Sequence, residues 1–157
     1  KRAYGVGKLG CSFVRSDDGK RYFIGEIYIG DPANSGEISP LALSGVEIAE
    51  GDEIVSLNGR LIGPDLSPRE ALFRYPSDEV VLGYRKKGKR KVNEVIVRTF
   101  GSEQALLYRK WVEKNRAYVH EKSGGKLGYV HIPDMVWRGF AEFHRYYLVE
   151  SQYDGLV

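Results

Sequence analysis

Short runs of alternating apolar and polar residues, separated by turn-forming residues, fill the first hundred positions of the chain. This alternation predicts half-buried β-strands. The runs lie at residues 9–14, 21–30, 52–57, 79–85 and 91–99. Gly88 and the pair Asn58-Gly59 supply the hairpin-type turns that such strands need.

Two short helical segments are predicted among these strands. The first is a turn at residues 40–44. The second starts with Ser67 as N-cap, Pro68 at the first helical position and Glu70 at the third, and Pro76 is expected to end it. Residues 1–100 are therefore expected to form a small, mostly β module.

A helical period replaces the alternation after residue 100. Apolar residues recur every three to four positions between 102 and 122 and between 136 and 151, which predicts two longer helices. Strands are predicted at 126–132 and from residue 155 onward. Strand, helix and strand in this order indicate a βαβ segment, here truncated, with parallel strands. The predicted class is α+β, with domains at 1–100 and 101–157.

Composition limits the class of protein and the cellular compartment that we expect for the chain. The 157 residues are 42% hydrophobic, which supports a real core. The single Cys11 forms no internal disulfide, so a reducing, cytoplasmic compartment is expected. No apolar run approaches the roughly 20 residues of a membrane span, so no membrane partner is expected. The chain starts without Met and ends in an apolar run, and we expect it to be a piece of a longer polypeptide.

The net charge of +3 hides a local basic cluster. Six positive charges lie between Arg85 and Lys91, and the rest of the chain carries −3. A basic patch can bind nucleic acid. No aromatic residues alternate with these basic ones as a stacking platform requires, so a solvated hairpin tip is the favoured interpretation.

The order of these elements resembles a PDZ domain of the tail-specific and tricorn-type serine proteases. The residues that carry this resemblance are a Leu-Gly loop at 9–10, the strand and turn EGDEIVSLNGRL at 50–61, and the helical segment 67–74. Three segments beyond residue 100 resemble the junction between the PDZ domain and the second catalytic subdomain in tricorn-type proteases. They are WVEKNRAYVHE at 111–121, LGYVHIPDM at 127–135 and EFHR at 142–145. The resemblance implies a PDZ-like, partly open β-barrel or sandwich at 1–100 and an incomplete catalytic α/β subdomain at 101–157.

The resemblance also implies what this chain lacks. In the family, the catalytic His belongs to a Ser-His pair before the PDZ domain, and the nucleophilic Ser follows in a strand–helix turn. The chain contains neither a Ser-His pair nor a Gly-x-Ser-x-Gly elbow. The parent is thus implied to be a peptide hydrolase, with no catalytic residue and no cofactor in this chain.

By resemblance, a peptide would add as a strand to the edge formed by residues 11–15, and backbone amides would hold its terminal carboxylate. The family loop is Gly-Leu-Gly-Phe, and Lys8 and Cys11 replace its first and last residues. Lys8 adds positive charge beside an anion, and Cys11 widens the pocket. The expected peptide-binding residues are Lys8, Leu9, Gly10, Cys11, Phe13, Arg69 and Leu72. An ordinary turn, with Leu9 in the core, is the alternative.

Other chemistry-bearing residues favour structural roles. His120, His131 and His144 form no metal-ligand spacing, so hydrogen-bonded His at a packing surface and no metal site are expected. Cys11 is expected to be a small core residue rather than a nucleophile. The stripes around Trp111 and Trp137 are expected to pack between the two helices, and a partner interface is the alternative.

Two functional hypotheses follow. The first is a peptide-binding module that engages peptide or protein C-termini, or extended segments, for a tricorn-like protease. The second is a structural module that braces the catalytic subdomains or a homo-oligomer of the parent. The rest of the parent chain is an expected partner in both, and nucleic acid is not.

Overall fold

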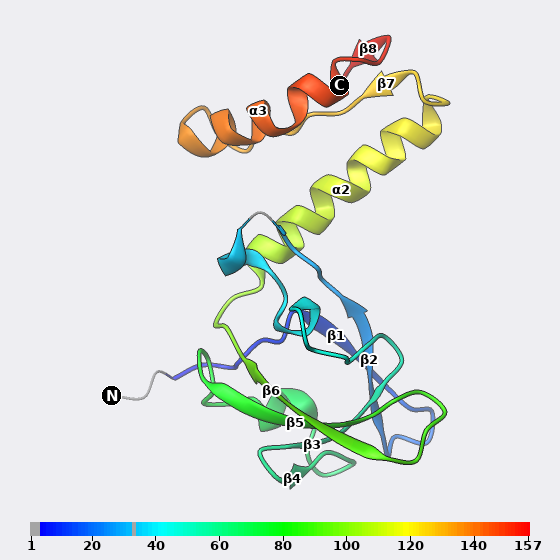
Figure 1. Ribbon diagram of the computed structural model, residues 1–157, viewed down its shortest axis with the longest axis vertical. Helices are drawn as coiled ribbons and strands as arrows, with labels where there is room; N and C mark the ends of the chain where they lie inside the picture. Colours follow the sequence, from blue (N-terminus) through cyan, green and yellow to red (C-terminus); the bar gives the residue numbers. More distant parts are fainter. Residues whose placement is uncertain (1–3, 33) are drawn as a thin grey trace. The chain divides into compact units, whose positions relative to one another are not determined.

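The computed structural model describes residues 4–32 and 34–157 of the chain, which form two compact units (Figure 1). The first extends to Leu107, and the second runs from Tyr108 to Val157. Each unit is described by itself below.

The first unit is built on an antiparallel sheet in the order β1-β2-β3-β5-β6. Its strands are β1 (Cys11–Arg15), β2 (Tyr22–Ile27), β3 (Glu53–Leu57), β5 (Glu79–Arg85) and β6 (Val92–Arg98), and β4 (Arg60–Leu61) pairs with β3. Each long strand lies within or close to a run predicted from the sequence. The order leaves β1 and β6 at the two edges of the sheet.

Short helical segments cover this sheet. They are the 3-10 turns η1 (Ser35–Glu37) and η2 (Pro40–Ala42) and the helix α1 (Pro68–Ala71). The capping box predicted for α1 is present, because the Ser67 hydroxyl accepts the Glu70 N–H and the Glu70 carboxylate accepts the Ser67 N–H.

The predicted end of α1 at Pro76 is wrong. The helix ends at Ala71, and the backbone after it binds the start of the chain. The Leu72 carbonyl accepts the Gly7 N–H at 2.9 Å, and the Arg74 N–H donates to the Gly5 carbonyl at 2.8 Å. These tertiary bonds replace a further helical turn.

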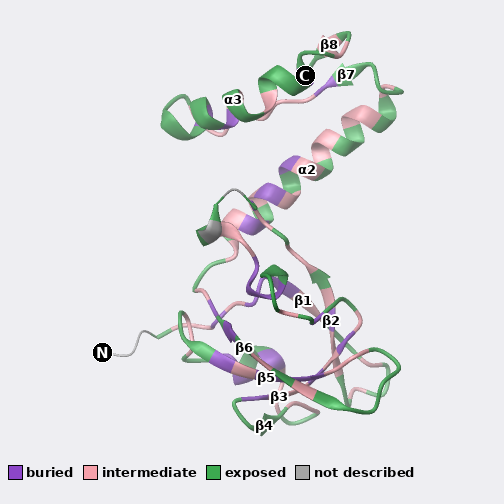
Figure 2. Cartoon of the chain, viewed as in Figure 1, coloured by how far each residue is buried: buried purple, intermediate pink, exposed green. Residues whose placement is uncertain are grey.

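Aliphatic side chains from the sheet, η2 and α1 make one core in this unit. Figure 2 colours the buried residues of these elements purple. The side chains that are exposed by 2% or less include Leu9, Ile24, Leu41, Ile54, Leu57, Leu72, Val80 and Leu82. Burying each of them contributes about 1.5–3 kcal/mol. Leu9 and Leu72, two of the expected peptide-binding residues, belong to this core.

The second unit holds most of the helix α2 (Gln104–Lys122), followed by β7 (Leu127–Gly128), α3 (Trp137–Glu150) and β8 (Gly155–Leu156). β7 and β8 pair in parallel, as a βαβ segment requires. The strand predicted at 126–132 is limited to two residues. The α+β class expected from the sequence is confirmed.

The predicted packing of Trp111 and Trp137 between the helices is wrong for Trp137. This side chain is 82% exposed and Trp111 is 47% exposed. An ion pair joins α2 and α3 instead, because Arg109 donates to both carboxylate oxygens of Glu142 at 2.7 Å. Among the described residues, no helix combines the length and apolar character that a membrane crossing needs.

Candidate functional site

The loop before β1 has a backbone conformation that depends on glycine. Gly10 has φ +69°, a region that side-chain-bearing residues rarely adopt. A Cβ at this position would lie 2.7 Å from Ser39 Oγ and 2.8 Å from Leu106 Cδ1. The buried Ser39 hydroxyl is also within hydrogen-bond distance of the carbonyls of Leu9 (2.9 Å) and Gly10 (3.2 Å). The loop is therefore held in one shape by contacts from η2 and α2.

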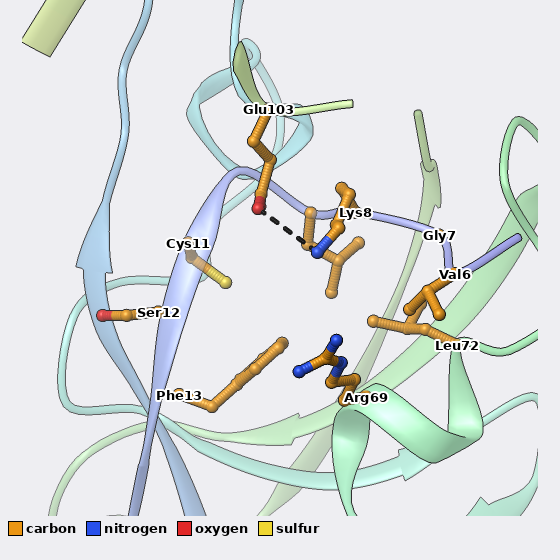
Figure 3. Close-up of a pocket in the computed structure, with 10 residues that line it drawn as sticks. Val6, Gly7, Lys8, Cys11, Ser12, Phe13, Arg69, Leu72 and Glu103 are labelled. Carbon is orange, nitrogen blue, oxygen red and sulfur yellow. Dashed lines mark ion pairs between the residues drawn. The ribbon is translucent and has the colours of Figure 1, made fainter. Parts of the chain in front are cut away.

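A pocket of about 190 Å³ lies between this loop, β1 and α1 (Figure 3). Six of the residues predicted from the sequence line it: Lys8, Leu9, Cys11, Phe13, Arg69 and Leu72. The seventh, Gly10, lies in the loop beside it. Residues 8–13 and 69–72 are far apart in the sequence, and the fold brings them to one concave surface.

β1 borders this pocket as an edge strand. It pairs with β2 on one side only, and β2 to β6 continue the sheet away from it. Its register with β2 shifts between Cys11 and Phe13. At the shift, the Ser12 hydroxyl accepts the Glu26 N–H at 2.8 Å, and Gly25 leaves room for it. The edge is thus anchored to β2 by a side chain as well as by its backbone.

α1 forms the wall opposite the loop. Its exposed Arg69 side chain extends over the pocket in Figure 3. Within residues 4–32 and 34–157, no acidic side chain pairs with Arg69. The neighbouring Glu70 carboxylate is engaged by Ser67 in the capping box, and the hydrogen bond from the Ser67 hydroxyl is the chief cause of its lowered pKa. Arg69 is therefore a charged group that can pair with an acidic group of a ligand.

Glu103 is the pocket residue that sequence reasoning missed. Its Oε1 accepts the Gly10 N–H at 3.1 Å, and its Oε2 lies 3.7 Å from Lys8 Nζ. An amide expected to receive a ligand's carboxylate thus binds a carboxylate of the chain itself. No local signal connects positions 93 residues apart, so the sequence gives no indication of this contact. Val6, Gly7 and Ser12 also line the pocket.

Cys11 has the environment of a core residue. Its side chain is buried, and burial together with the nearby Glu103 carboxylate raises the pKa of its thiol to about 12. A nucleophilic cysteine needs a lowered pKa. The geometry therefore favours the structural role expected for Cys11.

The histidines all lie against other side chains. His120 Nε2 is 2.7 Å from Glu150 Oε2, His131 Nδ1 is 2.9 Å from the Tyr108 hydroxyl, and the His144 ring packs on Phe140. Within the described ranges, no group of three His, Cys, Asp or Glu side chains is arranged to hold a metal ion.

The basic cluster at 85–91 lies at the hairpin between β5 and β6. Arg85 pairs with Glu53, and Lys86 Nζ lies 3.4 Å from Glu47 Oε2. Gly88, with φ +74°, makes the turn. Two of the cluster's charges are thus engaged by carboxylates of the sheet and its loops.

The chain is similar to known proteins over nearly its whole length. The family model described as the tricorn protease PDZ domain matches residues 7–102. A putative tricorn-like protease C-terminal subunit of Sulfurisphaera tokodaii is 45% identical over 97% of this chain. The tricorn protease of Thermoplasma acidophilum is 34% identical over 100% of it.

A solved structure gives the same relation. The crystal structure of the tricorn protease superimposes with a TM-score of 0.84 at 33% identity and covers 97% of this chain. The chain spans 17% of the Sulfurisphaera relative, and 14% of both the Thermoplasma relative and the crystallised chain. This chain therefore belongs to the tricorn protease PDZ domain family.

Proposed function

We propose that the first unit is the peptide-binding module of a tricorn-like serine protease. An extended peptide adds to the free edge of β1, and its apolar side chain enters the pocket lined by Phe13 and Leu72. The observation that carries this proposal is the juxtaposition of an edge strand and a pocket at the same residues. This is the geometry that β-augmentation uses, where backbone bonds supply affinity and pockets supply specificity.

The positive charge beside the pocket restricts the kind of peptide that should bind. The Arg69 guanidinium borders the pocket on the α1 side, so an acidic side chain of the peptide is its natural partner. Next to it lies a second pocket of about 340 Å³, lined by Val6, Arg69, Glu70 and Phe73. It offers a position for a further apolar residue of the peptide.

Titration of the ¹⁵N-labelled chain tests the proposal. The probes are acetylated hexapeptides with an apolar last residue and an aspartate two positions earlier, each with a free or an amidated C-terminus. We expect the amides of Leu9 to Arg15 to shift on binding. Arg69→Gln should weaken binding several-fold, and Arg60→Gln, at an exposed residue of β4 outside the pocket, should not. A chain in which no amide from Leu9 to Arg15 responds to any peptide would contradict the proposal.

One observation favours the structural module as a second candidate. The Gly10 N–H is bound by Glu103, so the loop also fastens the start of α2 to the sheet. A module that only braces the protease predicts normal assembly and peptide hydrolysis for Arg69→Gln in the full-length parent, because this exposed residue lines the pocket without anchoring the loop. Loss of hydrolysis with intact assembly would favour the peptide-binding role.

A further inference from the structure

The carboxylate of Glu103 lies where a peptide-binding loop of this kind would hold the end of a ligand. It accepts the Gly10 N–H at 3.1 Å and lies 3.7 Å from Lys8 Nζ, and its side chain is only 15% exposed. Figure 3 shows Glu103 and Lys8 meeting at the rim of the pocket. The Gly10 N–H and the Lys8 ammonium group thus already interact with one negative charge, the Glu103 carboxylate.

The position of Glu103 is held by its neighbours in the chain. Leu106, three residues later, is 2% exposed and packs against Gly10 and Gly30. A Cβ on Gly30 would come within 2.3 Å of Leu106 Cδ2. This buried anchor keeps the backbone of Glu103 beside the loop, so its carboxylate stays within reach of the Gly10 amide.

We propose that Glu103 takes the place of a ligand's terminal carboxylate, and that the groove therefore binds extended segments from within a polypeptide with no preference for free chain ends. The inference rests on the proposed peptide groove and deepens it by naming the class of ligand. A free C-terminus must displace Glu103 from Gly10 or lie beside it as a second negative charge. An internal segment does neither.

The remaining charge of the pocket fits such a segment. Lys8 is paired with Glu103, whereas Arg69 on the opposite wall has no acidic partner among the described residues. The attractive charge is therefore aimed at a side chain of the ligand rather than at its end. The ligand is an extended internal segment with an acidic side chain opposite Arg69 and backbone groups free to pair with β1.

The test compares matched peptides with the wild-type chain and two variants. The probes are the acetylated hexapeptides described above, each as the free acid and as the amide. Glu103→Ala removes the internal carboxylate. Glu94→Ala is the control, since it removes the same charge from an exposed position on β6 outside the pocket. Dissociation constants and the Gly10 amide resonance are measured for all three.

For the wild-type chain and Glu94→Ala, we expect acid and amide to bind within about threefold of each other. In Glu103→Ala the free acid should be preferred by about tenfold or more, because charge-assisted bonds to the vacated donors become available. Without peptide, the Gly10 amide should shift in Glu103→Ala and stay in place in Glu94→Ala.

Two results overturn this inference while leaving the peptide groove intact. One is a wild-type chain that already prefers free acids tenfold, with the same ratio in Glu103→Ala. The other is a Gly10 amide that Glu103→Ala does not move. Failure of every peptide to shift the amides of Leu9 to Arg15 overturns the proposed groove itself, and the inference with it.

Discussion

At the scale of single residues, Gly10 determines the shape of the loop beside the pocket. Its φ of +69° and the lack of space for a Cβ act together. Gly45 has φ +86° with no atom within 4 Å of a built Cβ, so it carries the conformational requirement without the steric one. The two positions form a matched pair.

We expect Gly45→Ala to lower the free energy of unfolding by about 1–2 kcal/mol, the cost of a left-handed conformation. Gly10→Ala should lower it by about 1–3 kcal/mol more than Gly45→Ala does, because the added Cβ overlaps Ser39 and Leu106. Chemical denaturation of both variants measures the difference. Equal losses would show that the contacts at Gly10 adjust freely.

Cys11 gives a second residue-scale prediction. A thiol with a pKa near 12 is almost entirely protonated at pH 8, whereas an unfolded cysteine with a pKa of about 8.5 is partly ionised. We expect a disulfide reagent at pH 8 to label the native chain at least about a hundredfold more slowly than the urea-unfolded chain. Comparable rates would contradict the buried, neutral thiol.

At the scale of elements, the capping box sets both the start of α1 and the pKa of Glu70. Hydrogen bonds from Ser67 lower this pKa below its ordinary value of 4.5. The contribution to stability is therefore present above the ordinary pKa and is lost as the pH falls through the lowered one.

Ser67→Ala should raise the pKa of Glu70 toward 4.5 and lower stability by about 1 kcal/mol through loss of the N-cap. An NMR titration of the Glu70 carboxylate measures the first effect. Ser102→Ala is the control, because the Ser102 hydroxyl accepts the Gln104 N–H at the start of a different helix. A Glu70 pKa that is the same in both variants would contradict the capping geometry.

The second unit depends on a buried ion pair between α2 and α3. Side-chain exposure is 8% for Arg109 and 9% for Glu142. Hydrogen bonding to Glu142 raises the pKa of Arg109 further above its already high ordinary value. Because an arginine guanidinium is not deprotonated in proteins, it stays charged when Glu142 is removed. Breaking such a pair leaves an uncompensated buried charge.

Glu142→Gln should therefore destabilise the second unit by about 3–5 kcal/mol, measured by the loss of helical circular dichroism in denaturant. Glu121→Gln, at an exposed pair with Lys122, should change stability by less than about 0.5 kcal/mol. The double change Arg109→Met with Glu142→Leu should restore part of the loss. A small effect of Glu142→Gln would mean that water reaches Arg109.

The sequence predicted elements well where the signal is local. The capping box fixed the start of α1, and alternation with Gly88 predicted the hairpin of β5 and β6. The end of α1 depends on backbone bonds to Gly5 and Gly7, which no local pattern contains. The two-residue length of β7 and the exposure of Trp137 have no local sequence signal either. The same is true of Glu103, whose contact with Gly10 closes a loop of 93 positions.

For the candidate site, the loop residues and Arg69 followed from the family resemblance, and the fold brings them to one pocket. The resemblance describes what a typical loop of this kind offers, namely free amides. It does not include a carboxylate from the residue just before the next helix. The positions of the groove residues were therefore predictable, but the occupation of the loop by Glu103 was not.

At the scale of the whole molecule, the chain spans 17% or less of the tricorn relatives it matches. The proteolytic chemistry that we propose for the parent lies in the remainder. What this segment contributes to that chemistry, by our account, is a surface that binds extended polypeptide. That claim concerns one edge of one sheet, and it can be tested on this chain alone.

The most direct test is whether β1 pairs with an added peptide strand. Backbone amide spectra of the labelled chain, recorded with increasing acetylated hexapeptide, report on each donor of this edge. Our account predicts saturable changes that centre on Leu9 to Arg15 and extend to Arg69 and Leu72, with β6 unaffected. Saturation elsewhere with β1 unchanged, or no change at any peptide concentration, would contradict it.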